Sequence, residues 1–299
     1  FKKTIKTSIS TMKSILVTGA GGQLGTALQK LSRTMPNAHF IFCRRSDLDI
    51  TQAAEVDRYF EEYDIGAVIN SAAYTKVDQA EKERGLAYQV NREGVENLAK
   101  ACCKADAWFF HISTDFVFNG EKNIPYKESD ITAPIGAYGH SKLEGEEAAL
   151  QNHHKTVIFR TSWLYSTTGH NFVKTMLRLG KERENLNVVY DQVGCPTFAE
   201  DLAVTLLQIL QKPDKLQGCE IFHFSNKGVA SWYDFAVAIM QLAKIECRVN
   251  PIETKDYPTP AQRPNFSVLD TQKIRQTFDI EIPYWRDSLE NCLYMLEEI

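Results

Sequence analysis

The chain has 299 residues, 43% of them hydrophobic, which is enough to bury one large core or a core and a smaller lobe. Its 34 Lys and Arg against 38 Asp and Glu leave a net charge of −4, which excludes a global basic field for nucleic acid. No apolar run approaches the ~20 residues of a membrane span, so we expect no membrane partner.

The N-terminus and the cysteines both favour a cytoplasmic protein. Residues 1–11 are basic but lack the apolar segment of a secretory signal, and Met12 is followed at once by an apolar run. We therefore interpret residues 1–11 as an N-terminal extension and Met12 as the natural start. The seven cysteines are scattered and form no C-x-x-C pair, which indicates reduced thiols.

Short apolar runs alternate with helical patterns through the first half of the chain. The runs lie at 14–18, 40–43, 67–70, 108–112 and 156–159, and the helical patterns at 24–31, 53–60 and 90–101. Strands that are apolar throughout and alternate with helices are typical of a parallel sheet covered on both faces. This predicts an α/β fold, a doubly wound parallel sheet of the Rossmann type.

After about residue 161 the alternation loosens. Helical segments at 171–179, 199–210, 232–242 and 286–298 mix with short strand candidates and Pro-rich connections. We predict a second, smaller α/β lobe that is interleaved with the first and binds substrate. The dinucleotide-binding domain is placed at 12–160 and the substrate-binding lobe mainly at 161–299.

A glycine-rich turn follows the first predicted strand. Gly19, Gly22 and Gly25 form G-x-x-G-x-x-G, with Gln23 and Leu24 between the last two. Such glycines allow a tight turn, let a pyrophosphate approach the backbone, and let helix and strand pack closely. The helix N-terminus then faces the phosphate charge. We predict that these five residues bind a dinucleotide; the alternative is a glycine-rich turn without a ligand.

The end of the second predicted strand bears on the choice of cofactor. NAD sites usually carry an acid there for the ribose 2′-OH, whereas this strand is followed by Arg44 and Arg45. Guanidinium groups suit a 2′-phosphate, so Arg44 favours NADPH, with NADH still possible. The alternative is a pair of solvated loop charges.

Two further segments follow predicted strand ends on the same edge. Asp49 and Ile50 lie where a loop could touch adenine. Ala72, Ala73 and Tyr74 follow the next strand and would lie above the pyrophosphate and ribose. These small residues could equally serve packing.

The pair Tyr138 and Lys142 has the spacing Y-x-x-x-K, which puts both residues on one face of a helix. An ammonium group there can lower the pKa of the phenol, so Tyr138 would donate a proton to a carbonyl under reduction. Lys142 would also bind the nicotinamide ribose hydroxyls. Thr114, at the end of a predicted strand, could donate a hydrogen bond to the carbonyl oxygen. The alternative is an exposed Tyr beside a solvated Lys.

Several segments in order resemble one family. Residues 18–25 (TGAGGQLG), 113–118 (STDFVF) and 138–146 (YGHSKLEGE) look like the extended short-chain dehydrogenase/reductase superfamily. Within it the chain resembles the dTDP-4-dehydrorhamnose reductases, from Met12 to the C-terminus. Segments 72–81, 160–165 and 191–197 belong to the same resemblance.

The resemblance implies reduction by NADPH or NADH of the C4 ketone of dTDP-4-dehydro-6-deoxy-L-mannose (dTDP-6-deoxy-L-lyxo-4-hexulose) to dTDP-L-rhamnose. It puts Thr114, Tyr138 and Lys142 in the catalytic roles described above. The substrate-binding residues that it implies are Thr75, Val77, Thr114, Asp115, Phe116, Trp163 and Arg263.

The chain departs from its relatives at one of these positions and at one predicted cofactor-binding position. Phe116 stands where many relatives have Tyr, which removes one possible hydroxyl contact. Arg44 replaces an acid that some relatives carry.

Related sugar-nucleotide 4,6-dehydratases have Asp-Glu after the threonine that corresponds to Thr114. Because this chain has Asp115-Phe116 there, it lacks the base for elimination.

Other readings stay open. The chain could reduce another nucleotide-4-keto-sugar, or could resemble the non-catalytic NADP-binding regulatory subunit that partners methionine adenosyltransferase. The seven histidines show no metal-ligand spacing, so we expect no metal site. Some relatives dimerise through acidic residues and Mg²⁺; a homodimer is possible here, but the sequence assigns no ligand.

Overall fold

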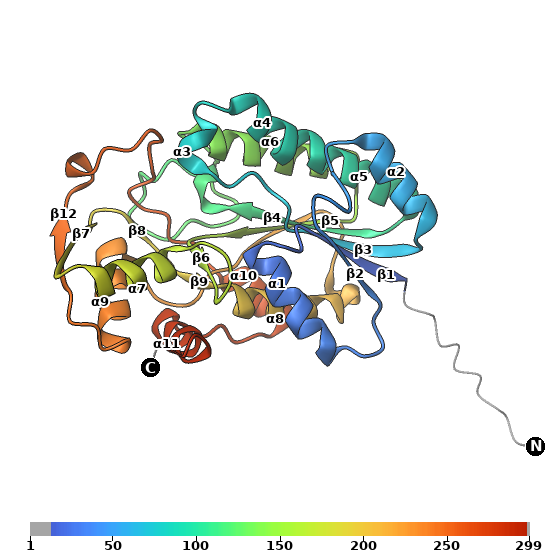
Figure 1. Cartoon of the computed structure of the whole chain (residues 1–299). Helices are drawn as coiled ribbons and strands as arrows, with labels where there is room; N and C mark the ends of the chain where they lie inside the picture. Colours follow the sequence, from blue (N-terminus) through green and yellow to red (C-terminus); the bar gives the residue numbers. More distant parts are fainter. Residues whose placement is uncertain (1–12, 298–299) are drawn as a thin grey trace, which may run out of the picture.

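The fold is organised around a parallel sheet, which the computed structural model shows within the described residues, 13–297. The predicted extension at 1–11 and Met12 lie outside this range. Six strands are arranged in the order β2-β1-β3-β4-β5-β10 (Figure 1). Their bounds are β1 Ser14–Thr18, β2 Phe40–Cys43, β3 Ile65–Asn70, β4 Trp108–Thr114, β5 Thr156–Thr161 and β10 Glu220–His223. Every pairing in this sheet is parallel, so the predicted α/β class is confirmed.

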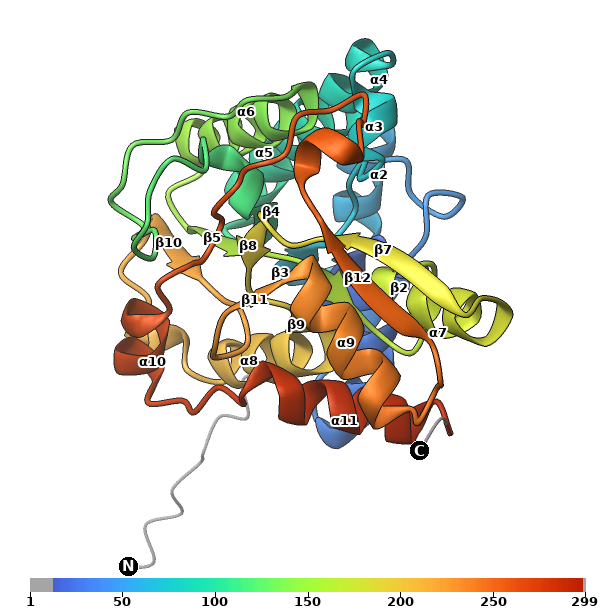
Figure 2. The same ribbon diagram turned by 90° about the vertical axis from the view of Figure 1, so that its left-hand side faces the viewer.

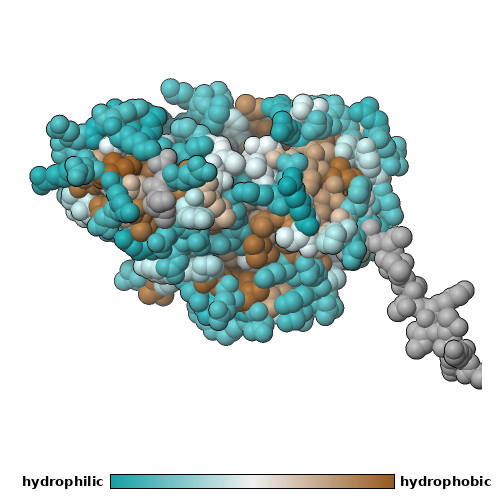
Figure 3. All heavy atoms as spheres, turned by 60° about the horizontal axis from the view of Figure 1, so that its bottom comes forward, coloured by the Kyte–Doolittle hydropathy of each residue, from teal (hydrophilic) through white to brown (hydrophobic). Residues whose placement is uncertain are grey.

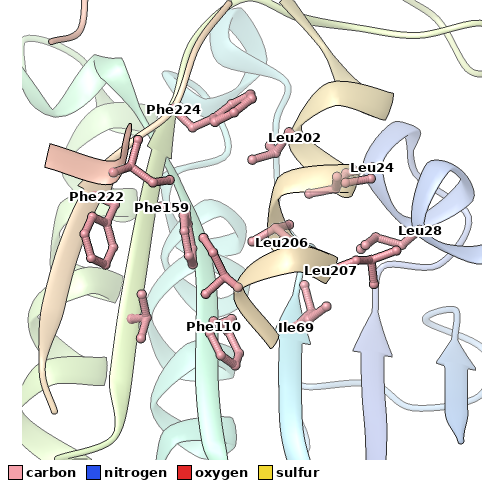
Figure 4. Packing of buried hydrophobic residues seen from close by; sticks show 14 of the residues in the cluster. Leu24, Leu28, Ile69, Phe110, Phe159, Leu202, Leu206, Leu207, Phe222 and Phe224 are labelled. Carbon is pink, nitrogen blue, oxygen red and sulfur yellow. The ribbon is translucent and has the colours of Figure 1, made fainter. Parts of the chain in front are cut away.

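Alternate strand residues face the two sides of the sheet. Leu16, Val68 and Phe109 pack on one side with α2 (Ala53–Glu62), α5 (Gly94–Ala105) and α6 (Ala137–Asn152). On the other side the sheet packs against α1 (Gln23–Leu31), α8 (Ala199–Leu210) and α10 (Gln272–Phe278). Figure 4 shows Phe110 and Phe159 from the sheet facing leucines of α8, with those of α1 beside them. Because both faces are covered, the strands are apolar throughout rather than alternating.

A second hydrophobic core is built from the later part of the chain. It joins α7 (Phe172–Glu182), α9 (Trp232–Leu242) and α11 (Trp285–Met295) to β7 (Asn185–Val189) and β12 (Arg248–Ile252). Figures 1 and 2 both show β7 and β12 beside α7 and α9. Residues beyond 160 contribute to both cores, since β10 is a strand of the large sheet and α8 packs against that sheet. The domain boundary at residue 160 stays a prediction.

Four short strands form two further small sheets. β8 (Val193–Gly194) pairs antiparallel with β11 (Ala230–Ser231), and β6 (Leu164–Tyr165) pairs in parallel with β9 (Thr197–Phe198). Short 3₁₀ turns occur at Ser32–Thr34, Asp115–Val117, Pro213–Lys215 and Thr254–Asp256.

The helix expected at 90–101 begins earlier and is irregular. After α3 (Val77–Ala80), α4 (Arg84–Tyr88) passes into a π-helical turn, Gln89–Glu93, and then into α5. Within that turn Asn91 is fully buried, and its side chain bonds both backbone polar groups of Tyr74, at 2.8 and 3.0 Å. Single π-helical turns are often found at functional sites, and this one holds the segment that follows β3.

The surface carries mostly hydrophilic side chains on the face seen in Figure 3, with hydrophobic patches between them. Among residues 13–297 no helix combines the length and apolar character needed to cross a membrane.

Candidate active site

A cleft with a volume of about 360 Å³ opens beyond the carboxyl ends of β1, β2 and β3. The chain winds in opposite directions from β1, to β2 on one side and β3 on the other, and α/β sheets bind ligands at such a reversal. Predicted cofactor residues that line the cleft are Gly19, Gly22, Arg44, Asp49, Ile50, Ala72, Ala73 and Tyr74. The structure thus brings together residues from four segments that the sequence indicated separately.

The turn after β1 requires a glycine at position 19. Gly19 has φ +68°, and a Cβ there would lie 2.6 Å from the backbone nitrogen of Ala72. A side chain would therefore separate the turn from the segment after β3. Because Gly19 has no side chain, a pyrophosphate can approach the backbone of this turn closely.

Three residues of the turn do not present side chains to the cleft. Leu24 and Gly25 are buried in α1, and Leu24 packs in the core below the sheet. The amide of Gln23 is bonded to the backbone oxygen of Leu164 at 3.2 Å and to Asn171 at 2.9 Å. Because of this burial and bonding, only the backbone of these residues is left to meet a cofactor, and their contact with a cofactor stays a prediction.

The two arginines after β2 differ in their partners. Arg45 forms an ion pair with Asp49, at 3.1 Å between Nε and Oδ2. Both arginines are exposed and line the cleft, and no ion pair to Arg44 occurs in the described part of the chain. The Arg44 guanidinium is therefore the group that can meet a 2′-phosphate without first breaking an ion pair.

The predicted catalytic residues meet where β4 ends and α6 begins. A Cβ at Gly139 would overlap the backbone oxygen of Phe116, so the glycine lets the first turn of α6 approach the segment after Thr114. There Tyr138 and Thr114 share a side-chain hydrogen bond. The ring of Phe116 meets the ring of Tyr138 edge-on, with centroids 5.6 Å apart. The hydroxyls of Tyr138 and Thr114 can thus reach one substrate oxygen.

The pKa of Tyr138 does not move in the expected direction. Burial raises the pKa of the phenol to about 12, and the nearby Asp115 carboxylate adds to the rise, while the bond with Thr114 lowers it in part. The prediction that Lys142 acidifies Tyr138 is therefore wrong for this structure, because desolvation is the largest influence and Lys142 points elsewhere. Tyr138 remains protonated near neutral pH, as a proton donor must.

Lys142 is held under the end of β4. Only 2% of it is exposed, and Nζ donates a hydrogen bond to the backbone oxygen of Ile112 at 2.6 Å. Nζ also lies 3.2 Å from Nε2 of His111, whose Nδ1 lies 3.0 Å from the amide nitrogen of Asn70. Burial lowers the pKa of Lys142 to about 8, against the opposing effect of Glu146. Lys142 is thus tied to the ends of β3 and β4.

A buried ion pair supports the same helix from the next strand. Arg160 on β5 donates three hydrogen bonds to the Glu146 carboxylate, from Nε to Oε1 at 3.0 Å and to Oε2 at 3.2 Å, and from Nη2 to Oε2 at 2.7 Å. Arg160 is 3% exposed and Glu146 1%, and Ser113 donates a fourth bond to the same carboxylate. Because Glu146 is one turn after Lys142, the pair fixes the face of α6 that carries Lys142 over β4 and β5.

One small hydrophobic cluster links the wall of the cleft to the predicted catalytic residues. Tyr74 from the cleft wall and Tyr138 both pack against Ala80, Ala87 and Ala137. The Tyr74 hydroxyl donates to Glu83 at 2.6 Å, so only Tyr138 directs its hydroxyl toward Thr114.

The residues implied for substrate lie on several segments. Thr75 is exposed and Val77 begins α3. Trp163, with φ +48°, stacks on Trp232 with ring centroids 3.6 Å apart. Arg263 is paired with Asp78 at 2.8 Å, so its guanidinium already has an anionic partner. Contact of these residues with substrate stays a prediction.

Comparisons with known proteins agree over nearly the whole chain. A family model described as RmlD substrate binding domain matches residues 12–298. A dTDP-4-dehydrorhamnose reductase of Aggregatibacter actinomycetemcomitans is 44% identical over 288 residues, covering 94% of this chain and 98% of the relative. The chain belongs to the dTDP-4-dehydrorhamnose reductase family. The family resemblance seen in the sequence is confirmed.

Solved structures of family members have the same fold. The dTDP-4-dehydrorhamnose reductase of Clostridium acetobutylicum superposes with a TM-score of 0.90 at 43% identity, covering 95% of this chain and 99% of the other. That of Bacillus anthracis strain Ames, in complex with NADP, also gives 0.90, at 40% identity and with the same coverage.

Sequence reasoning missed the polar residues that surround the predicted catalytic residues. His111 interrupts the apolar run 108–112, and a polar residue inside a buried strand was the available signal. Asn70 and Arg160 likewise lie at the ends of buried strands. Asn91 and Glu146 lie on helices, where no local pattern separates them from surface residues.

We expect kcat/KM to fall as pH rises through about 8, because the free enzyme then loses the ammonium group of Lys142. The pH profile of kcat/KM for the nicotinamide nucleotide, which reports on the free enzyme, measures this. Lys142→Arg, which stays charged, should move the fall to higher pH. A wild-type profile that stays flat to about pH 10, the ordinary lysine range, would contradict the expectation.

The same group makes stability depend on pH. Its folded pKa of about 8 is below its ordinary 10.5, so between these values the unfolded chain binds more protons. The contribution of Lys142 to stability therefore rises with pH across that window.

Proposed function

We propose that the protein reduces the C4 ketone of dTDP-4-dehydro-6-deoxy-L-mannose to dTDP-L-rhamnose, with NADPH as hydride donor. As a member of its family it is an NAD(P)H-dependent nucleotide-sugar reductase. The observation that carries the proposal is the Tyr138–Thr114 hydrogen bond, which lies beside a cleft lined by the glycine-rich turn.

Each residue of the site has a separate role in the proposed reduction. NADPH, when bound, supplies the hydride to the ketone carbon. Tyr138 gives its phenolic proton to the ketone oxygen, and its raised pKa keeps that proton in place until negative charge develops. Thr114 donates a hydrogen bond to the same oxygen, which strengthens as the oxygen gains charge. Lys142 holds the ribose hydroxyls and receives its orientation from Ile112.

The structure of the cleft fits the nucleotide. A Cβ at Gly19 would close the approach to the backbone, and the exposed Arg44 side chain lines the same cleft. The Bacillus anthracis relative was solved with NADP. These observations support NADPH as the preferred cofactor, with NADH as a weaker substitute.

Reduction is favoured over elimination by the residue after Asp115. Position 116 carries Phe, whose ring packs on Tyr138, so no second carboxylate stands beside the catalytic phenol at that position. The free cysteines at all seven positions agree with a reducing compartment and hence with a cytoplasmic location.

The proposal is tested by incubating the purified chain with NADPH and dTDP-4-dehydro-6-deoxy-L-mannose. Loss of the reduced-nicotinamide absorbance and formation of dTDP-L-rhamnose are expected. dTDP-glucose, which has no ketone, is the control and should not oxidise NADPH. Turnover only with a different nucleotide-4-keto-sugar would transfer the activity to that substrate. Nucleotide binding without turnover of any keto-sugar, together with co-purification of a synthetase, would support a regulatory subunit instead.

A further inference from the structure

A cluster of metal-ligand side chains lies at the far end of the helices that form the catalytic face. Cys103 is in the last turns of α5, and His153 and His154 follow directly after α6. One ligand atom from each lies within 4.8 Å of the others. Tyr138 and Lys142 are at the start of α6, which has 16 residues and is therefore about 24 Å long. The cluster is thus separate from the nucleotide cleft.

His153 has the arrangement of a metal ligand. It is 2% exposed, and Nε2 donates a hydrogen bond to the backbone oxygen of Ala107 at 2.6 Å. Its other nitrogen, Nδ1, is buried and has no hydrogen-bond partner. A histidine that binds a metal usually donates its second ring N–H to a carbonyl in this way, which leaves the first nitrogen with a free lone pair. The buried unpaired nitrogen is otherwise a cost without compensation.

We propose that Cys103, His153 and His154 bind a divalent transition-metal ion of the zinc class, with the fourth position open to water. Thiolate and imidazole are ligands that Zn²⁺ prefers, at about 2.3 Å for sulfur and about 2.0–2.1 Å for nitrogen. Those lengths require ligand atoms roughly 3.3–3.6 Å apart in a tetrahedron. The exposed side chains of Cys103 and His154 can close the remaining gap by rotation toward the fixed His153.

The proposal revises the expectation from the sequence that the chain has no metal site. The ligands are separated by about fifty positions, too far for a spacing motif, and come together only because α5 and α6 pack side by side on one face of the sheet. An ion there would join the ends of these two helices. Since it binds the folded chain only, it would raise the stability of that chain.

Cobalt binding to the whole chain, stripped of metals and kept reduced, tests the proposal. We expect one Co²⁺ per chain, with the thiolate-to-cobalt absorption band, and displacement of that band by Zn²⁺. Cys103→Ser should abolish the band, and His154→Gln should weaken Co²⁺ binding at least tenfold. Both side chains are exposed, so the variants should fold as the wild type does, which circular dichroism would check.

A matched control is available in Cys219. It is also exposed, and its sulfur lies near the same turn, 3.3 Å from the backbone oxygen of His153 and 3.5 Å from that of His154, but it is outside the ligand set. Cys219→Ser should keep both the band and the affinity. Cobalt binding that survives in Cys103→Ser, or that is lost in Cys219→Ser, would overturn the assignment. Reductase activity should be the same in all three variants, which keeps this result separate from the proposed function.

Discussion

Replacement of Tyr138 by Phe should lower kcat about 10²–10⁴-fold and leave the affinity for NADPH nearly unchanged. The variant keeps the ring that packs against Ala137 and Phe116 but removes the hydroxyl bonded to Thr114. Without that proton, negative charge on the ketone oxygen is balanced only by the hydrogen bond from Thr114. Steady-state kinetics and fluorescence titration with NADPH would measure the two effects separately.

Tyr88→Phe serves as the matched control, since Tyr88 is another partly buried tyrosine of the same helical layer. It should retain kcat within about twofold. A Tyr138→Phe variant with kcat within tenfold of the wild type would remove the phenol from the mechanism. Loss of NADPH binding in that variant would instead point to a structural role for the hydroxyl.

Replacement of Glu146 by Gln should destabilise the protein by about 3–5 kcal/mol, because it leaves the Arg160 charge buried without its partner. The exposed pair Arg178–Glu182 provides the comparison, and Glu182→Gln should cost no more than about 0.5 kcal/mol. Urea unfolding of the three proteins measures both values. The pKa of Lys142 should also fall, since Glu146 is the charge that raises it.

Equal stability losses in the two variants would show that the buried pair is not held as the structure indicates. A second test replaces both partners, Glu146→Leu with Arg160→Leu, which removes the charges together. The double variant should be more stable than Glu146→Gln, since no buried charge is left unpaired. If the double variant instead loses as much stability as the two single substitutions lose together, the side chains contribute by their packing.

The sequence alone determined the features that depend on local order. Strands that are buried on both faces are apolar throughout, so their positions could be read directly, and β1 and β2 begin and end at the predicted residues. The turn at Gly19 and the spacing of Tyr138 and Lys142 were also local signals, since a backbone turn and a helix face each depend on a few neighbouring residues.

Only the tertiary structure decided what depends on distant contacts and on exclusion of water. The Tyr138 phenol is made less acidic by burial, and the Arg263 guanidinium is occupied by Asp78, which is far away along the chain. The Cys103 and His153 side chains meet because two helices end together. No spacing rule contains such information, because desolvation and charge pairing are set by what the folded chain places around each group rather than by its neighbours in sequence.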